Sequence, residues 1–500
     1  MRKYLFVFIH IFTFVQYASA QTIEVEMQGT AVDGQTPLWL NANKYGVSSL
    51  ESNGILRVSA MEDCEKRDSA AFNYGYGADV VVASGMSSTL FLQQAYVEGR
   101  WHNGKLTIGA KEEPMELKNQ KLSSGSQTFG INAHPIPQVR LALDDYWNIP
   151  GTRKWLGVKG HIAYGAYTDS KWQKGFVNET SRYCTGMLQH SKAGYLRIGK
   201  ESDSPHFITT LGLEMANVFG GDTYTRFPDD PIHSHRKNFS AFWHALIPGG
   251  ADVTERGTSN AEGNILGSWL ARVDYHGKDW TIGIYADKFF DDHSAMFMLD
   301  YDGYGSGENK NVKEKTKFHL YDFKDIMLGM EWKSKEPGWL DNIVVEYLYT
   351  KYQSGAVFHD HTANVPEHYC GKDDYYNHGN FPPWQHWGQV IGNPLYLSPI
   401  YNNDGDLSVK NNRFVAYHLG FSGHPVGNLD YRVLASFQDG MGTYFNPYPA
   451  YRKSFNFLAE ATYRFRQAKG DWRLTAAIGI DRGNIHGNNA GAQFTLGKTL

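Results

Sequence analysis

The sequence is poor in cysteine and in long apolar runs. It contains three cysteines, Cys64, Cys184 and Cys370, and this odd number at wide spacing excludes a disulfide framework and permits one bridge at most. After residue 20 no stretch reaches about 18 consecutive apolar residues, so the sequence predicts no membrane-spanning helix. The formal charge of −4 is too small to argue for a nucleic-acid partner, and we expect none.

Motifs of catalysis and cofactor binding are also missing. The chain has no G-x-S-x-G nucleophile elbow, and it has neither the phosphate-loop nor the Rossmann glycine fingerprint. Serine-rich stretches such as 123–126 and the 20 histidines are present, but no pattern sets a nucleophile beside a base. We therefore predict no enzymatic activity and no cofactor. A barrel hydrolase acting on lipid or glycan is the enzymatic alternative.

Aromatic residues and glycine are abundant instead. The chain contains 31 Tyr, 28 Phe, 13 Trp and 52 Gly, a composition that argues against disorder, because disordered chains lack aromatics. Arg2 and Lys3 precede an apolar run to about Val15, and a small-x-small pattern ends at Ala20. These features predict a secretory signal peptide at residues 1–20. We divide the remainder into an N-terminal periplasmic segment, 21–60, and a β-barrel, 61–500.

The dominant pattern is alternation of apolar with polar or small residues. Between Trp472 and Ile480 every second residue is apolar, and after a turn rich in glycine and asparagine the alternation resumes from Ala490 to Leu496. Successive side chains on a strand point to opposite faces, so each segment has one apolar face. Similar segments recur from residue 72 to the end of the chain. The sequence therefore predicts an all-β protein built of strands and hairpins.

The opposite faces of these segments carry charged residues, namely Glu98, Arg100, Glu214, Arg272, Asp274, Glu331, Glu346, Arg432, Glu460, Arg464, Arg473 and Asp481. A soluble sandwich would leave these charges in water, whereas a membrane barrel turns the apolar faces to lipid and the charges to a wet interior. The segments have the roughly 9–11 residues that a tilted spanning strand needs. We predict a transmembrane antiparallel barrel of sixteen to eighteen strands, with a large secreted sandwich as the alternative.

The connections between segments are unequal in length. Short ones at 103–104, 276–278, 468–471 and 482–489 fit periplasmic turns or short hairpins. Long ones fit external loops, and they are 168–193, 218–262, 300–320, 353–411 and 438–454. The stretch 231–248 has helical character and could fold over the mouth of the barrel.

The stretch from about 353 to 411 is the richest in chemistry. Its histidines and Cys370 include the pairs His359-x-His361 and His368-x-Cys370, but no closed zinc-finger spacing is present and we predict no metal. Flat aromatic faces beside amides and imidazoles suit the C–H faces and hydroxyl groups of sugars. We therefore predict a polysaccharide-binding site made by Tyr375, Tyr376, Asn377, His378, Trp384, His386 and Trp387. The alternative is that these aromatics pack the loop into a plug.

Several motifs go beyond periodicity. The segment 109–139 contains Leu-Ser-Ser-Gly at 122–125 and Asn-Ala-His-Pro-Ile-Pro at 132–137. Together with the motifs at 375–378, 392–395, 411–413 and 438–444, this segment resembles the Wzi family of capsule assembly proteins across nearly the whole mature chain. The resemblance implies an outer-membrane barrel of eighteen strands whose lumen is occluded by loops, acting as a lectin for capsular polysaccharide. It also implies N-terminal helices at the periplasmic end, yet residues 29–55 show no clear helical period.

The preferred function is therefore an outer-membrane lectin for surface attachment or assembly of capsular polysaccharide in a Gram-negative bacterium. The expected partners are capsular polysaccharide and outer-membrane lipid, and we expect a monomer. The alternative is an oligosaccharide-permeable porin or transport barrel. Steady open-channel conductance in planar bilayers would separate that alternative from the lectin.

Overall fold

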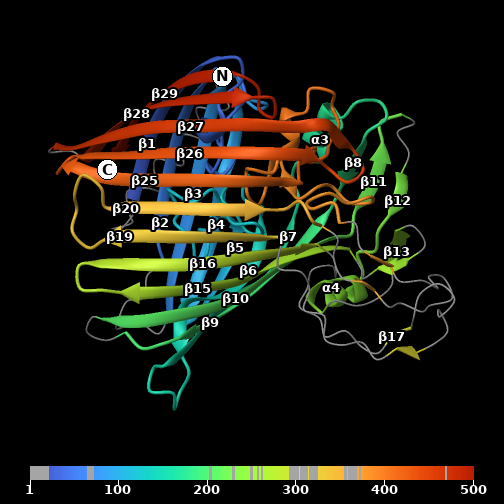
Figure 1. Cartoon of the computed structure of the whole chain (residues 1–500), viewed down its shortest axis with the longest axis horizontal. Helices are drawn as coiled ribbons and strands as arrows, with labels where there is room; N and C mark the ends of the chain where they lie inside the picture. Colours follow the sequence, from blue (N-terminus) through green and yellow to red (C-terminus); the bar gives the residue numbers. More distant parts are fainter. Residues whose placement is uncertain are drawn as a thin grey trace.

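The protein is a closed β-barrel. The computed structural model describes residues 22–64, 72–201, 205–227, 231–247, 252–255, 258–260, 263–291, 303–304, 313–314, 325–353, 357–358, 369–370, 373–467 and 470–500. Its main feature is an 18-stranded antiparallel sheet whose strands pair in chain order, and the last strand pairs with the first (Figure 1). The alternation of the sequence thus predicts the barrel correctly, and the strand number lies at the upper end of the predicted range.

Around the ring the strands are β1 (Thr22–Asp33), β2 (Asn53–Glu62), β3 (Phe72–Ser84), β4 (Leu90–Trp101), β5 (Gly104–Ala110), β6 (Gln138–Asn148), β7 (Leu156–Ala166), β9 (Leu188–Ile198), β10 (His206–Phe219), β15 (Asn264–His276), β16 (Trp280–Asp291), β19 (Ile326–Ser334), β20 (Asn342–Tyr349), β25 (Phe414–Val426), β26 (Leu429–Gly442), β27 (Pro447–Gln467), β28 (Gly470–Gly483) and β29 (Asn489–Thr499).

Shorter elements lie in the connections. They are the helices α2 (Leu38–Asn41), α3 (Ser170–Phe176), α4 (Phe239–Leu246) and η3 (Pro399–Tyr401), and the strands β8 (Arg182–Thr185), β11 (Asp222–Thr225), β12 (Pro231–Ser234), β13 (Asp252–Glu255), β14 (Thr258–Asn260), β17 (Gly303–Tyr304), β18 (Lys313–Glu314), β21 (Val357–Phe358), β22 (Tyr369–Cys370), β23 (Gln385–His386) and β24 (Gln389–Val390). Among the residues listed above as described, no helix is long and apolar enough to cross a bilayer.

The two faces of the barrel wall have opposite chemistry. Apolar side chains such as Ile478 and Phe494 point outward and are about half exposed, while Asp481 and Gln493 on the same strands are buried inside. Aromatic residues gather on the outer face near the short turns, and they include Phe72, Trp101, Trp155 and Phe207. Because tyrosine and tryptophan belong at the membrane–water interface, this arrangement is that of an outer-membrane barrel of a Gram-negative cell.

The two ends of the barrel differ in the length of their connections. One end carries short turns and both termini of the sheet, whereas long connections, α3, α4 and the sheet β8–β11–β12 lie at the other (Figure 1). The second is the external end. One prediction is confirmed and one is corrected here. The connection 484–488 is a short hairpin between β28 and β29, as predicted, and it lies at the external end because β29 runs from it to the end with the short turns. The long loop expected at 438–454 is mostly strand, with a turn at 443–446 only.

Three segments fill the lumen, and we call them the plug: residues 34–52, 111–137 and 373–413. The middle segment, which connects β5 to β6, reaches the opposite wall, where Lys118 pairs with Asp287 of β16 at 2.6 Å and the carbonyl of Leu122 accepts from His418 Nε2 of β25 at 2.8 Å. Ser123 donates to Glu346 of β20 at 2.5 Å. These buried polar contacts explain the charged inner stripes, since charges removed from water must be paired. The occluded lumen agrees with the expectation.

The N-terminal prediction needs correction. Residues 21–60 are not a separate periplasmic segment, because β1 pairs with both β2 and β29 and thereby closes the barrel. Between β1 and β2 the chain enters the lumen from the external end, where the one-turn helix α2 buries Leu38, Trp39 and Leu40 against β27 and β28. The alternation of apolar and polar residues over Ile23–Met27 was the sequence signal for strand β1. The signal peptide predicted at residues 1–20 lies outside the described residues.

Helix α4 forms where helical character was predicted, but it does not cover the mouth of the barrel. Tyr164 Oη donates to the carbonyl of Phe242 at 2.8 Å, and Lys192 donates to the carbonyl of Leu246. Tyr164 has the same parity on β7 as the exposed Ile162, so α4 packs on the outer face of the wall.

Candidate functional site

The predicted aromatic site residues lie together in the third plug segment, but most of them are buried. Tyr375, Tyr376 and Trp384 are completely buried, and His386 is 1% exposed. Asn377, His378 and Trp387 are partly exposed. The buried residues therefore pack inside the plug. Only Asn377, His378 and Trp387 present surface that a glycan can contact without movement of the plug.

Hydrogen bonds join the buried aromatics to the second plug segment. Trp384 Nε1 donates to the carbonyl of Thr128 at 2.9 Å, and Tyr376 Oη donates to the carbonyl of Gln127. The ring of Tyr376 also stacks on Tyr396 with centroids 4.1 Å apart. Tyr375 Oη donates to Asp325 at 3.1 Å. These contacts satisfy the polar atoms of large buried side chains, as burial requires.

The histidine and tryptophan that follow connect the plug to an external loop. His386 Nδ1 donates to the carbonyl of His134 at 2.9 Å, and His386 Nε2 lies 3.0 Å from Thr168 Oγ1. Trp387 Nε1 donates to the same hydroxyl at 3.3 Å. Trp387 has a φ of 54°, which is unfavourable for a residue other than glycine, so its backbone is held by these surroundings.

Asn377 and His378 make local contacts. The Asn377 side chain bonds both backbone groups of Val409, with Nδ2 donating at 3.0 Å and Oδ1 accepting at 2.8 Å. His378 Nδ1 accepts from the amide of Asn380 at 3.0 Å. The candidate metal ligands His359, His361 and His368 lie outside the described residues. Among those that are described, no three His, Cys, Asp or Glu side chains gather in a way that could hold a metal ion.

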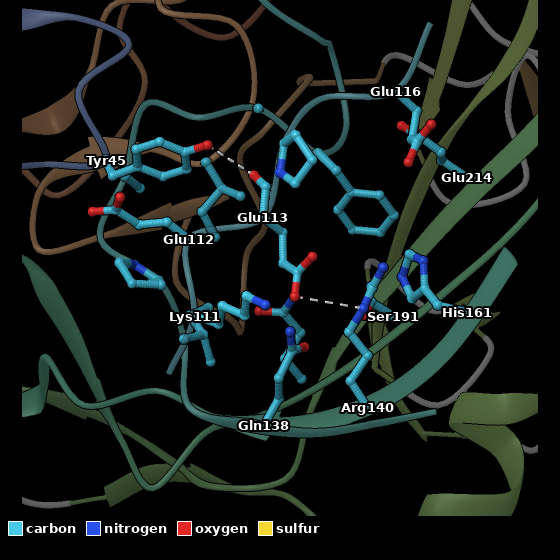
Figure 2. A pocket seen from close by; sticks show the side chains of 18 of the residues that line it. Tyr45, Lys111, Glu112, Glu113, Glu116, Gln138, Arg140, His161, Ser191 and Glu214 are labelled. Carbon is cyan, nitrogen blue, oxygen red and sulfur yellow. Dashed lines mark hydrogen bonds and ion pairs between the residues drawn. The ribbon is translucent and has the colours of Figure 1, made fainter. Parts of the chain in front are cut away.

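A cavity of about 340 Å³ lies between the plug and the inner wall, on the side formed by β5, β6, β7, β9 and β10. Figure 2 shows polar side chains converging on this space, among them Glu113, Arg140, His161 and Ser191. The cavity is also lined by the aromatic rings of Tyr45, Phe129 and Tyr195, which the sequence did not identify as site residues. The volume lies at the lower end of the range of about 300–1,000 Å³ that is typical of small-molecule sites.

Ion pairs order most of the charged groups of the cavity. Lys159 Nζ lies 2.7 Å from Glu116, Arg140 Nε lies 3.8 Å from Glu113, and Lys105 pairs with Asp144. Lys111 bonds to Glu98 on the neighbouring wall at 2.8 Å, and Glu112 bonds to Arg57 at 2.8 Å. Pairing of this kind stabilises charges that are partly removed from water.

Four polar atoms of residues that line the cavity have no hydrogen-bond partner among the described residues, and each has almost no accessible surface: Glu113 Oε1, Arg140 Nε, Gln189 Oε1 and Glu214 Oε2. Glu214 is fully buried, and while its Oε1 accepts from Tyr195 Oη at 2.7 Å, its Oε2 is unbonded. Gln189, which is 8% exposed, has an unbonded Oε1. Burying a polar atom without a partner is costly, so these atoms lower the stability of the lining, and none of them is exposed to a molecule in the cavity.

Burial shifts the titration of the plug residues beside the cavity. It lowers the pKa of His134 to about 3, with His386 adding a smaller effect in the same direction. Burial raises the pKa of Glu112, although Arg57 opposes the shift. It also raises the pKa of the Tyr45 hydroxyl, which donates to the carbonyl of Glu113 at 3.1 Å (Figure 2). His134 is therefore neutral at physiological pH and offers no positive charge to a ligand.

Sequence reasoning did not find this cavity. Glu214 was recognised only as one of many charges on an inner stripe, and Gln189, Ser191 and His161 carry no motif. The available signal was the segment 109–139, which the family resemblance singled out and which forms one side of the cavity. The rest comes from the inner faces of five consecutive strands, which border a cavity only because the plug packs beside them.

Comparison with known proteins supports the fold. No protein-family model and no curated protein matches the chain. Wzi, an outer-membrane protein involved in group 1 capsule assembly in Escherichia coli and described as a carbohydrate-binding β-barrel, is 12% identical with a TM-score of 0.57, over 95% of this chain and 83% of that chain. OccK5 (OpdH) and OpdK of Pseudomonas aeruginosa are each 9% identical with a TM-score of 0.46 over 97% of this chain, and over 99% and 100% of their own chains. The chain thus has the fold of an outer-membrane β-barrel.

Proposed function

We propose that the protein is a non-enzymatic carbohydrate-binding barrel of the outer membrane, related to the Wzi family, that takes part in surface attachment or assembly of capsular polysaccharide. The observation that carries this proposal is a lumen closed by a hydrogen-bonded plug that retains a polar, aromatic-lined cavity of about 340 Å³. Aromatic faces and buried hydrogen-bonding groups together suit sugar rings.

The fold-level similarity to Wzi and the motifs between 109 and 139 support the same proposal. In this scheme the partly exposed Asn377, His378 and Trp387 contact the polysaccharide from the external side. Tyr375, Tyr376, Trp384 and His386 hold the segment in place beneath them. We propose a monomer in contact with outer-membrane lipid.

The alternative, an oligosaccharide-permeable porin, has less support. Plug contacts such as Lys118 with Asp287 are buried on both sides, with side-chain exposures of 1% and 0%. A permeation path on that side of the lumen would require the pair to separate inside the protein, at a cost of about 3–5 kcal/mol.

Two measurements on the purified, detergent-solubilised protein test the proposal. Binding to capsular polysaccharide of the host, measured by surface plasmon resonance, is expected to be saturable, and the heat-denatured protein serves as control. Planar bilayers are expected to show no steady large open-channel current. Steady current without polysaccharide binding would replace the proposal by the porin.

A further inference from the structure

The outer face of the barrel wall carries a helix toward its external end. Helix α4 packs on strands β9 and β10 (Figure 1), and Ala241 and Ala245 on its underside are buried. The ring of Phe242 lies 5.2 Å from that of Phe219 on β10 and 5.3 Å from that of Tyr164 on β7. The wall of an outer-membrane barrel faces lipid over part of its height and water above it. The height of α4 along the wall therefore decides what its other face contacts.

A hydrogen bond to the wall fixes this height. Lys192 on β9 donates to the carbonyl of Leu246 in the last turn of α4. Strand β9 ends at Ile198, beside a short turn, where the amide of Gly199 donates to the carbonyl of Trp155 at 2.9 Å. From Ile198 to Lys192 the strand covers about 20 Å, which at the usual tilt is roughly 15 Å along the barrel axis. Because the apolar band of such a barrel is about 25 Å tall, the C-terminal end of α4 lies within the height of the membrane.

The wall beneath α4 carries polar groups on its lipid-facing side. Ser191 lines the inner cavity, so its neighbours His190 and Lys192 point outward. His190 has no exposed surface, with its ring 4.4 Å from that of Tyr164, and Lys192 is partly buried. A lysine that faces hydrocarbon is destabilising unless a polar group satisfies it. The carbonyls of a last helical turn have no partner within the helix, and the carbonyl of Leu246 is the acceptor that Lys192 requires.

The opposite face of α4 is apolar and open. Phe239, Trp243 and Ile247 recur at intervals of four residues, so they share one side, and they are 84%, 49% and 51% exposed. Within the described part of the chain, no other large apolar side chain is as exposed as Phe239. This face continues the lipid-facing surface of the wall, to which Ile162 on β7 and Leu211 on β10 belong. An apolar helix face that adjoins lipid-facing wall at this height is suited to acyl chains rather than to water.

We propose that α4 is an interfacial helix of the outer leaflet, in which Phe239, Trp243 and Ile247 contact lipid acyl chains while the underside shields Lys192 and His190 of the wall. The occupant is lipid rather than a second copy or another protein, because the face is continuous with a surface that lipid covers and lies at the same height. Trp243 also matches the preference of tryptophan for the membrane boundary. This inference concerns the position of the barrel in the membrane and does not depend on the carbohydrate-binding function.

Lipid that carries a photoreactive diazirine in its acyl chain tests this contact on the unmodified full-length protein. The protein is reconstituted into phosphatidylcholine bilayers that contain a small fraction of this lipid, illuminated, digested with trypsin and analysed by tandem mass spectrometry. We expect adducts at 239–247 and on the lipid-facing strand β16, in peptide 279–288, and none on peptide 122–140 of the plug. Adducts on β16 without adducts on α4 would overturn the proposal, whether water or a second copy covers the helix.

Two variants place the same charge at two positions of the helix. Trp243→Asp is expected to reduce the adducts on α4 at least threefold relative to those on β16, because a carboxylate is unfavourable in hydrocarbon. Ser240→Asp is the control, since the Ser240 hydroxyl lies 3.3 Å from His244 Nδ1 on the polar side of the helix, and it is expected to reduce them less than twofold. Equal reductions by the two variants would contradict the proposed orientation of α4. Heat-modifiable gel mobility establishes that both variants form a barrel, and if either does not, the adducts on the unmodified protein decide.

Discussion

Two parts of the lumen have the same kinds of residue and use them in opposite ways. In the third plug segment, Tyr376 and Trp384 are fully buried, and each hydroxyl or indole group has a partner. At the cavity, Tyr195 has its hydroxyl bonded to Glu214, but the other oxygen of that carboxylate has no protein partner. The aromatic rings of the first region belong to a packed core, whereas Tyr195 lines a cavity.

This difference shows why aromatic composition alone does not identify a sugar site. An aromatic ring can stack on another ring of the protein, as Tyr376 does on Tyr396, or its face can remain available to a ligand. A cavity beside the ring is the more specific sign, because a ring inside a packed core has no face left for a ligand. The variants below test whether the third plug segment is a structural core and whether its exposed part binds polysaccharide.

The largest effect is expected from Trp384→Ala. The substitution removes a completely buried indole and leaves the carbonyl of Thr128 without its donor, so we expect the free energy of unfolding to fall by about 3–5 kcal/mol. Thermal unfolding followed by heat-modifiable gel mobility measures the loss. Trp101→Ala, at an outward-facing position that is 66% exposed, serves as the control. A loss below about 1 kcal/mol would mean that the third segment is not a core.

Sequence patterns predicted the wall of the barrel but not its contents. The alternation between Trp472 and Ile480 indicates which side chains face lipid. Side chains on a strand alternate between two faces, and only the apolar face is stable against the hydrocarbon of the membrane. The plug has no such period. Its residues are buried through contacts between distant segments, such as Ser123 with Glu346, that no local pattern records. Likewise, Gln189 and Glu214 are ordinary in sequence, and only the fold places both in the lining of the cavity.

A smaller effect on the same region is expected from Tyr376→Phe. Its hydroxyl donates to the carbonyl of Gln127 and accepts from the amide of Asn393 at 3.0 Å, so removing it leaves both buried groups unpaired. We expect a loss of about 1–3 kcal/mol in the free energy of unfolding, measured by denaturant titration of the refolded barrel. Tyr74→Phe, on the exposed outer face, is the matched control and should be neutral.

Acid should weaken the contact between the two regions. Burial lowers the pKa of His134 to about 3 and also lowers the pKa of His386, while an unfolded histidine titrates near 6.5. Below pH 6.5 the unfolded chain therefore binds more protons than the folded one, and stability falls as the pH decreases toward 3. On the order of 2 kcal/mol should be lost through His134 by pH 5, and His386 adds to the loss in the same direction.

Thermal midpoints at pH 7 and pH 5 measure this loss, and His134→Gln should reduce the difference between them. The control is His102→Gln, in the short turn between β4 and β5. A difference between the midpoints that His134→Gln leaves unchanged would assign the acid sensitivity to other groups.

The smallest effect on folding, and the most direct test of the external surface, is expected from Trp387→Ala. Trp387 is half-buried and contributes one hydrogen bond at 3.3 Å to Thr168, so its removal should cost about 1 kcal/mol or less in stability. The part of its ring that is exposed should nevertheless matter to a polysaccharide, because one aromatic contact is worth about 0.5–1.5 kcal/mol, or up to roughly tenfold in affinity. Surface plasmon resonance with capsular polysaccharide measures the change, and Trp387→Phe should restore most of the binding. Unchanged affinity in folded Trp387→Ala would leave the inner cavity as the site that recognises sugar and reduce the third plug segment to a structural core.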